Sequence, residues 1–94
     1  MIKYEFNRNE FENALDFYSV IKDKMNLPEW FGNNTAALYD MLTGHIETPC
    51  KITLVGFNLE KENEINRYYL KYILDVFTDV EVEFPDEFEI IFKQ

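Results

Sequence analysis

The stretch Leu27–His45, which reads LPEWFGNNTAALYDMLTGH, predicts a turn, a short helix and a stop, and the rest of the chain is organised around it. Pro28 interrupts any helix that precedes it. Asn33 and Asn34 follow, and both side chains are in reach to cap a new helix. Gly44 ends that helix, because glycine readily adopts the conformations that terminate helices.

The predicted helix has two unlike faces. On a wheel of 3.6 residues per turn, an apolar stripe faces inward and small and polar residues collect on the opposite side. The inner stripe is Leu38, Met41 and Leu42, and the outer side holds Asn33, Ala36, Asp40 and Thr43, with Tyr39 on its flank. Thr43 and Gly44 leave room for another molecule to come close. We expect the outer face to carry the function.

Charge limits the classes of partner. The formal net charge is −9, from 18 acidic and 9 basic side chains. Such a surface repels the phosphates of nucleic acids and of anionic membranes, which argues against both as ligands. The remaining partners are basic proteins and cations, unless the charge serves only to keep the protein in solution.

Length and residue usage indicate one globular unit. With 94 residues, of which 47% are hydrophobic, the chain can bury one core, so we expect a single domain over residues 1–94. Cys50 is the only cysteine, which excludes an internal disulfide and favours a reducing compartment. Met1–Arg8 is too charged for a signal peptide, and no apolar run has membrane-spanning length. We therefore expect a cytoplasmic protein that is monomeric when free.

Periodic patterns predict the elements of the first half. Ile2–Phe6 alternates apolar and charged residues, as in a strand with one buried face. Asn9 is predicted to cap the next helix, with Glu12 at the spacing of a capping box. Apolar residues then recur at helical spacing from Phe11 to Met25, which predicts a helix of about four turns.

The second half is predicted to supply two more strands and a helix. Cys50–Val55 alternates as a central strand, Leu59–Asn66 is a charge-rich helical turn or loop, and a helix runs from about residue 65 to 77. Val80–Phe84 alternates and is predicted as an extended approach to the strand Phe88–Phe92, the alternative being a hairpin with it. The order β-α-α-β-α-β predicts an α/β fold, a three-stranded parallel sheet with helices packed on it.

Catalytic chemistry finds little support in the sequence. His45, the only histidine, follows Gly44 at the predicted end of the helix. We expect a surface residue there rather than a general base. Cys50 opens a strand and is expected to be buried and inert. Tyr68, Tyr69 and Tyr72 are helical neighbours that we expect in the core and at its rim. We predict no catalytic residue, no metal site and no cofactor.

At the predicted short helix the sequence resembles the barstar family of intracellular ribonuclease inhibitors. The resemblance is carried by Leu27–Asn34, Ala37–Asp40, Leu42–Gly44 and Pro49, about twenty residues with the family spacing. It implies the barstar fold, and it implies that the helix and the preceding turn enter the basic active site of a barnase-type ribonuclease or related toxin. Acidic side chains there take the place of RNA phosphates, as in an immunity protein of a toxin–antitoxin pair.

The resemblance also assigns partner-binding residues. Asp40 matches the principal acid, Gly44 the glycine that permits close approach, and Asn34 an asparagine of the motif. Aromatic positions are exchanged: Trp30 stands where the family has tyrosine, and Tyr39 where it has tryptophan. Asp79 falls near a family glutamate in the last helix.

Two positions depart from the family pattern. Ala36 stands where barstar has an interface aspartate, and His45 where it has an interface tryptophan. The leading hypothesis is therefore an inhibitor that occludes a basic ribonuclease. A second hypothesis keeps the fold but makes the protein an acidic interaction or regulatory module with a partner that is not a ribonuclease. A small enzyme that uses Asp40 or His45 is the weakest hypothesis, since no base–nucleophile pair is visible.

Overall fold

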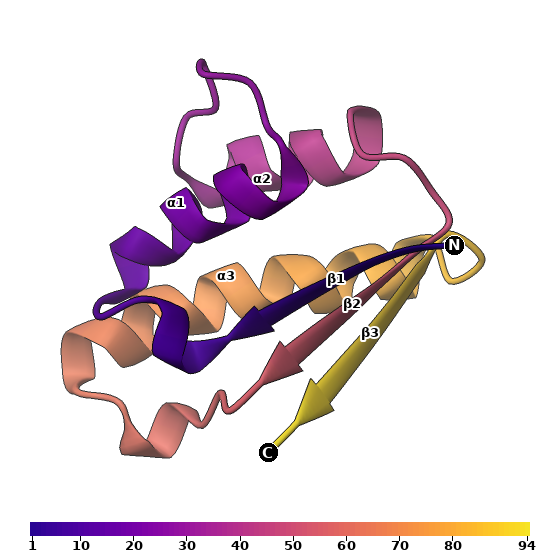
Figure 1. Ribbon diagram of the computed structural model, residues 1–94. Helices are drawn as coiled ribbons and strands as arrows, with labels where there is room; N and C mark the ends of the chain where they lie inside the picture. The colour runs from indigo at the N-terminus through magenta and orange to yellow at the C-terminus, as the bar shows by residue number, and fades with distance from the viewer.

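Three parallel strands form a single sheet in the order β1-β2-β3. In the computed structural model, which describes residues 1–94, the strands are β1 Ile2–Asn7, β2 Cys50–Val55 and β3 Phe88–Lys93 (Figure 1). The register pairs Ile2 with Cys50 and Cys50 with Phe88, so equivalent positions lie in rows across the sheet. The prediction that Cys50–Val55 is the central strand is confirmed.

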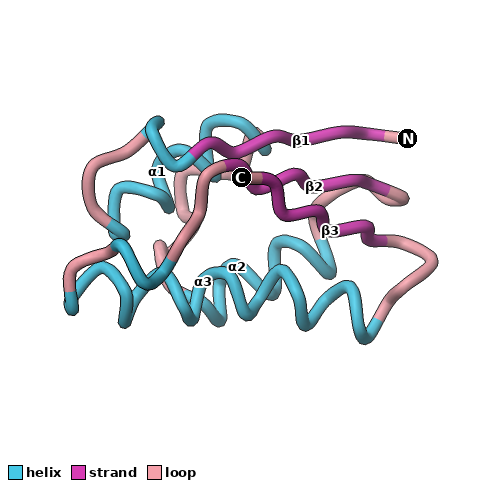
Figure 2. Tube along the Cα trace, turned by 90° about the horizontal axis from the view of Figure 1, so that it is seen from below, coloured by secondary structure: helices cyan, strands magenta, loops and turns pink.

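The helices cover one face of this sheet (Figures 1 and 2). They are α1 Ala14–Met25, α2 Thr35–Gly44 and α3 Glu64–Glu83, with short 3-10 turns at Arg8–Glu10 and Leu59–Lys61. Parallel neighbours are joined by right-handed crossovers, and both crossovers step in the same direction across the sheet, so the helices fall on the same side. The predicted order β-α-α-β-α-β is confirmed. No helix is both long and apolar enough to cross a membrane.

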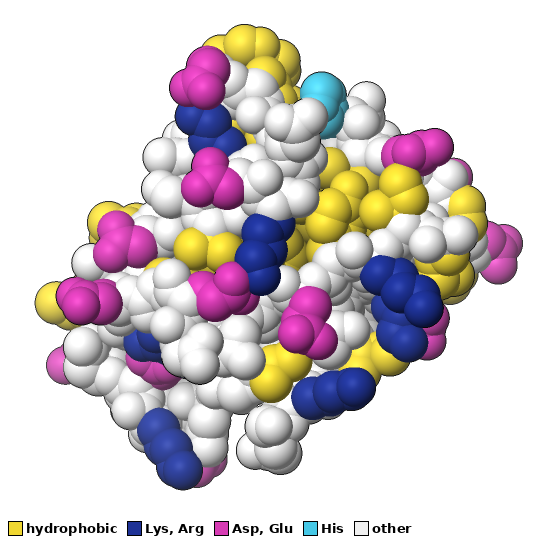
Figure 3. Space-filling view, viewed as in Figure 1, with side chains coloured by type: hydrophobic (Ala, Val, Ile, Leu, Met, Phe, Trp, Pro, Cys, Tyr) yellow, Lys and Arg dark blue, Asp and Glu magenta, His cyan; other side chains and the backbone are white.

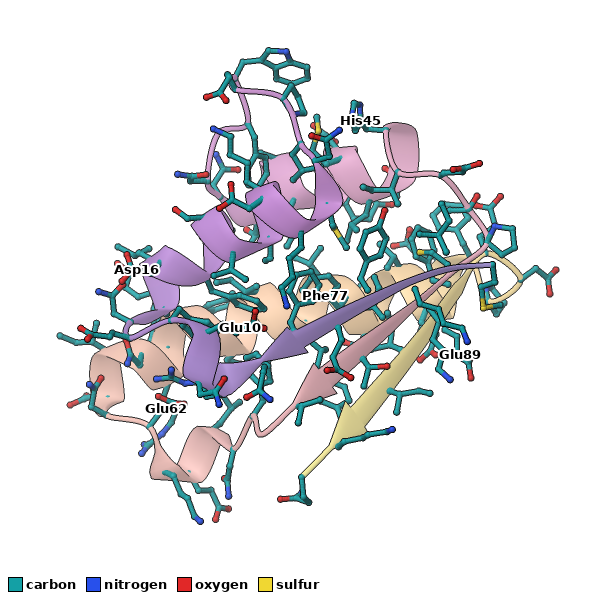
Figure 4. The ribbon with its side chains drawn as sticks, in the orientation of Figure 1. Glu10, Asp16, His45, Glu62, Phe77 and Glu89 are labelled. Carbon is teal, nitrogen blue, oxygen red and sulfur yellow. The ribbon has the colours of Figure 1, made fainter.

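Three buried phenylalanine rings hold the helices to the sheet. Phe6 of β1 packs edge-on against Phe17 of α1, with ring centroids 5.6 Å apart, and lies 6.1 Å from Phe77 of α3. Phe77 lies between α3 and the strands (Figure 4). All three side chains are fully buried, so this cluster ties three elements into one core.

The opposite face of the sheet is open and carries charged side chains. One row across this face consists of Lys3, Lys51 and Glu89. Lys93, the last residue of β3, lies on the same face. Figure 3 shows basic and acidic side chains interspersed over the strands. Side chains also cover the free edges, because Lys24 Nζ donates to the Glu5 carbonyl at 2.7 Å and Glu81 Oε2 accepts from the Ile90 amide at 2.8 Å. Such covering disfavours pairing with another strand.

The prediction for the start of α1 is wrong. Asn13, not Asn9, caps the helix, since its side chain accepts from the Asp16 amide, and α1 begins at Ala14. A capping box does exist two residues before the predicted pair Asn9 and Glu12, where Asn7 and Glu10 close the short 3-10 turn. Several closely spaced asparagines offer the same chemistry, and only the packing of the chain selects among them.

The prediction that Val80–Phe84 is extended is also wrong, because α3 continues to Glu83. Val80 is fully buried, three residues after Phe77 on the same helical face. Val82, which shares a face with Val80 in a strand, is 79% exposed. The helix ends at Glu83 with Phe84 as its C-cap, and Pro85 follows, as is common after a helix C-terminus. Burial on the existing core thus overrides the alternating pattern.

An ion pair fastens the connection between β2 and α3 to the end of β1. Arg8 donates from Nε and Nη2 to both carboxylate oxygens of Glu62, at 2.6 and 2.9 Å, and from Nη1 to the carbonyl of Phe11 at 2.7 Å. Both side chains are largely buried, with 22% and 10% exposed. The hydrogen bonds from Arg8 hold the pKa of Glu62 below its usual value.

The substitution Glu62→Gln is expected to lower the free energy of unfolding by about 1–3 kcal/mol at neutral pH, because it weakens two charge-assisted hydrogen bonds. The depressed pKa of Glu62 means that the pair stabilises the fold fully above the unfolded pKa of 4.5 and loses its effect as the pH falls through the folded pKa. The difference between variant and wild type should therefore shrink under acid conditions. Urea unfolding at about pH 7 and about pH 3 measures it.

Glu60→Gln is the matched control, because this substitution makes the same change of charge at an exposed residue of the 3-10 turn that Glu62 caps. It should change stability little at either pH. Equal losses in the two variants, or a difference that does not depend on pH, would contradict this role of the ion pair.

Candidate functional site

Helix α2 has defined ends and one buried face. The Asn34 side chain accepts from the Ala37 amide at 2.8 Å and so caps the helix, and Gly44 is its last residue, as predicted. Leu38, Met41 and Leu42 are buried against the core. The outer face is exposed, and Ala36, Asp40, Thr43 and Gly44 lie on it. The helix therefore presents an outer face that takes no part in the core.

A hydrogen bond joins this helix to the end of α3. The Tyr39 hydroxyl donates to Glu83 Oε2, forty-four residues further along the chain. This hydrogen bond, together with the charges of Glu83, Asp40 and Asp79, raises the pKa of Tyr39. The fold thus brings one carboxylate of α3, Glu83, into contact with the Tyr39 hydroxyl, while Asp40 and Asp79 act on the same phenol through their charge alone. We call Asp40, Asp79 and Glu83 the acidic cluster.

Glu83 is the member of the acidic cluster that the sequence reading missed. An extended Val80–Phe84 segment does not carry Glu83 back towards α2, whereas the observed helix does. A signal was present, since Ile73, Phe77 and Val80 continue a helical stripe to within one turn of Glu83. Asp79, which was predicted, lies exposed on the same helix.

Trp30 projects from the loop between α1 and α2, with 72% of its surface exposed. The loop is anchored on either side of it, because Leu27 and Phe31 are both buried. The Phe31 ring packs edge-on against Tyr18 with centroids 6.1 Å apart, and its amide donates to the Pro28 carbonyl at 3.0 Å. A turn fixed in this way holds the indole out from the body of the protein, on the loop between α1 and α2 that lies at the top of Figure 1.

The other predicted site residues have simpler surroundings. Asn34 uses both polar atoms locally, since its Nδ2 also donates to the Gly32 carbonyl at 3.1 Å. The Thr43 hydroxyl donates to the Tyr39 carbonyl one turn earlier. His45 caps the C-terminus of α2 and lies at the surface (Figures 3 and 4). No hydrogen bond or ion pair joins Trp30, Ala36 or His45 to the acidic cluster.

Gly44 gives the outer face of α2 an unusually bare end. A Cβ built at Gly44 meets no atom within 4 Å, so the protein's own packing does not require glycine there. Gly56, by contrast, has φ +79°, a conformation that other residues rarely adopt. Glycine at position 44 therefore leaves space on the outside of the molecule.

The arrangement suits recognition of positive charge better than catalysis. Exposed carboxylates and aromatic rings bind cationic groups, and arginine pairs with carboxylates through two hydrogen bonds. No group of three or more His, Cys, Asp and Glu side chains is placed to hold a metal ion. Burial raises the pKa of the Cys50 thiol, which disfavours the reactive thiolate.

Comparison with known proteins extends the resemblance to the whole chain. The family model described as "Barstar (barnase inhibitor)" matches residues 1–93. A Bacillus subtilis (strain 168) protein named "Putative ribonuclease inhibitor YrdF" is 36% identical over 93 residues, which span 99% of this chain and 100% of that protein. Both matches span the sheet, the three helices and the loop between α1 and α2, and the chain belongs to the barstar family of ribonuclease inhibitors.

Proposed function

We propose that this protein inhibits a ribonuclease, of barnase type or a related toxin, by placing the outer face of α2 over its basic active site. The observation that carries the proposal is the Tyr39–Glu83 hydrogen bond, which joins the outer face of α2, with its exposed Asp40, to the end of α3, with its exposed Asp79 and Glu83. A ribonuclease must present cationic groups to bind RNA phosphates. A rigid set of carboxylates fits the same groups and excludes the substrate.

Rigid presentation supports tight binding. The caps at both ends of α2 and the Tyr39–Glu83 hydrogen bond hold the helix against α3, so little order is lost on association. Trp30 adds a large aromatic surface with few rotatable bonds, the kind of residue that dominates interfaces. A reducing, cytoplasmic location accords with the single buried, unpaired Cys50.

An acidic interaction module with a partner that is not a ribonuclease is the second candidate. It is favoured by Ala36 and His45, which are exposed at α2 and replace an acidic and an aromatic family residue. Titration of RNA cleavage by barnase and by a panel of secreted bacterial ribonucleases separates the candidates. Stoichiometric inhibition of one of them supports the first, and inhibition of none, with capture of another basic protein, supports the second.

The substitution Asp40→Ala is expected to weaken inhibition at least about 30-fold, because it leaves desolvated cationic groups of the partner without a counter-charge. The fold should be retained, since Asp40 is exposed on a helix and alanine is the best helix former. Glu89→Ala, on the open face of the sheet, makes the same change in net charge and should leave inhibition within about twofold. Inhibition constants and melting temperatures of both variants test this, and equal effects on inhibition would reject the α2 mechanism.

Gly44→Ala separates binding from stability. The variant should be as stable as the wild type or more stable by up to about 1 kcal/mol, because the added methyl meets no atom and alanine favours the helix. Inhibition should weaken about tenfold or more if the partner's surface packs against position 44. Unchanged inhibition by a stable Gly44→Ala protein would place the partner elsewhere.

The association rate is expected to fall about tenfold or more between 50 mM and 500 mM NaCl, whereas the dissociation rate changes by less than about threefold. Long-range attraction between a chain of net charge −9 and a basic enzyme is screened once the Debye length falls below about 10 Å. Stopped-flow or biosensor kinetics measure both rates. An association rate that does not respond to salt would count against electrostatic steering.

A further inference from the structure

Three tyrosines of α3 lie exposed where the sequence reading expected core and rim. Tyr68 is 59% exposed, and its ring packs edge-on against Tyr69 and Tyr72 with centroids 5.2 and 5.0 Å away. Their hydroxyls make no hydrogen bond within the chain. With neighbouring residues of α1 and α2 they form a shallow groove of about 330 Å³, the tyrosine groove, lined by Leu15, Tyr18, Thr35, Tyr68, Tyr69 and Tyr72.

The charges around the groove favour a cationic occupant. No lysine or arginine lines it, and a carboxylate, Glu64, borders the adjoining hollow together with Ile65, Tyr68 and Tyr69. Lys71 gives an example within the chain of a cation held by a ring and a carboxylate together. Its Nζ lies 5.4 Å from the Tyr72 ring centroid and 3.0 Å from Asp75 Oδ2. The rings of Tyr68 and Tyr69 have no such cation. A second copy of this chain is a poor occupant, since each copy has a net charge of −9.

The groove is continuous with the acidic cluster. Tyr68, Tyr72, Asp75, Asp79 and Glu83 are spaced three or four residues apart, so they follow one face of α3 over about 22 Å. Thr35, the first residue of α2, lines the groove from the other side. A protein that covers α2 and the acidic cluster with an interface of ordinary size, about 800 Å² on each side, also reaches the groove.

We propose that the tyrosine groove receives an arginine side chain of the ribonuclease that α2 binds, with the guanidinium lying on the Tyr68–Tyr69 pair and facing Glu64. Arginine fits better than lysine, because its planar guanidinium stacks on aromatic rings and still offers hydrogen bonds to a carboxylate. The identity of the partner in this inference rests on the proposed function. The preference of the groove for a guanidinium group can be measured without the ribonuclease.

The test uses the full chain with ¹³C-labelled tyrosine rings and two decapeptides, one of alternating Arg and Gly and one of alternating Lys and Gly. The Arg peptide should shift the ring signals of Tyr68 and Tyr69 and bind at least about threefold more tightly than the Lys peptide. Tyr68→Leu should weaken the Arg peptide about three- to fivefold, whereas Tyr68→Phe, which keeps the ring, should remain within about twofold. Glu64→Gln should weaken binding more than Glu60→Gln, which removes an exposed carboxylate outside the groove.

Several results would overturn the inference. Equal affinity for the two peptides, or an unchanged affinity in Tyr68→Leu, shows that the groove does not select a guanidinium group. If sedimentation shows that the protein self-associates and that Tyr68→Leu abolishes the self-association, a second copy of the chain is the occupant of the groove instead. If Asp40→Ala weakens inhibition of RNA cleavage but Tyr68→Leu does not, the groove is not part of the interface with the ribonuclease. The proposed inhibitor function is then unaffected. Absence of inhibition by the wild type, with the Arg peptide still selected, would reject the ribonuclease as the partner.

Discussion

The contact among Phe6, Phe17 and Phe77 is the interaction on which the rest of this structure depends. It joins the first strand, the first helix and the last helix, which are distant in the sequence, across one face of a sheet that has no helix on its other face. Loss of one such ring typically costs 3–5 kcal/mol, out of a total stability of about 5–15 kcal/mol. Without this core, α3 loses its aromatic anchor on the sheet.

The core uses only part of α2, and this division shapes the candidate site. Leu38 and Leu42 are fully buried, whereas Asp40 and Gly44 make no contribution to packing. Residues on the outer face can therefore change without loss of the core. The Tyr39–Glu83 hydrogen bond links the two regions, because it fixes the helix that presents the outer face to the helix that anchors in the core.

The distribution of charge gives the molecule two different sides. Carboxylates from α2 and α3 gather around Tyr39, whereas Lys3, Lys51 and Lys93 lie on the open face of the sheet. The acidic cluster therefore lies on the helical side of the molecule, whereas acidic and basic side chains, Glu5 and Glu89 among them, are interspersed over the open face. The exposed tyrosines of α3 extend the same side with aromatic surface.

Local patterns in the sequence were enough to predict the strands, the order of elements, a cap at Asn33 or Asn34, and the inner and outer faces of α2. Alternation, helical spacing and capping act over only a few residues. Only the tertiary structure decided among chemically equivalent neighbours. It chose Asn13 over Asn9, kept Val80–Glu83 helical and left Tyr68 exposed. These outcomes depend on which surfaces meet the Phe6–Phe17–Phe77 core. The same long-range packing brings Glu83 to Tyr39, a contact that no local pattern specifies.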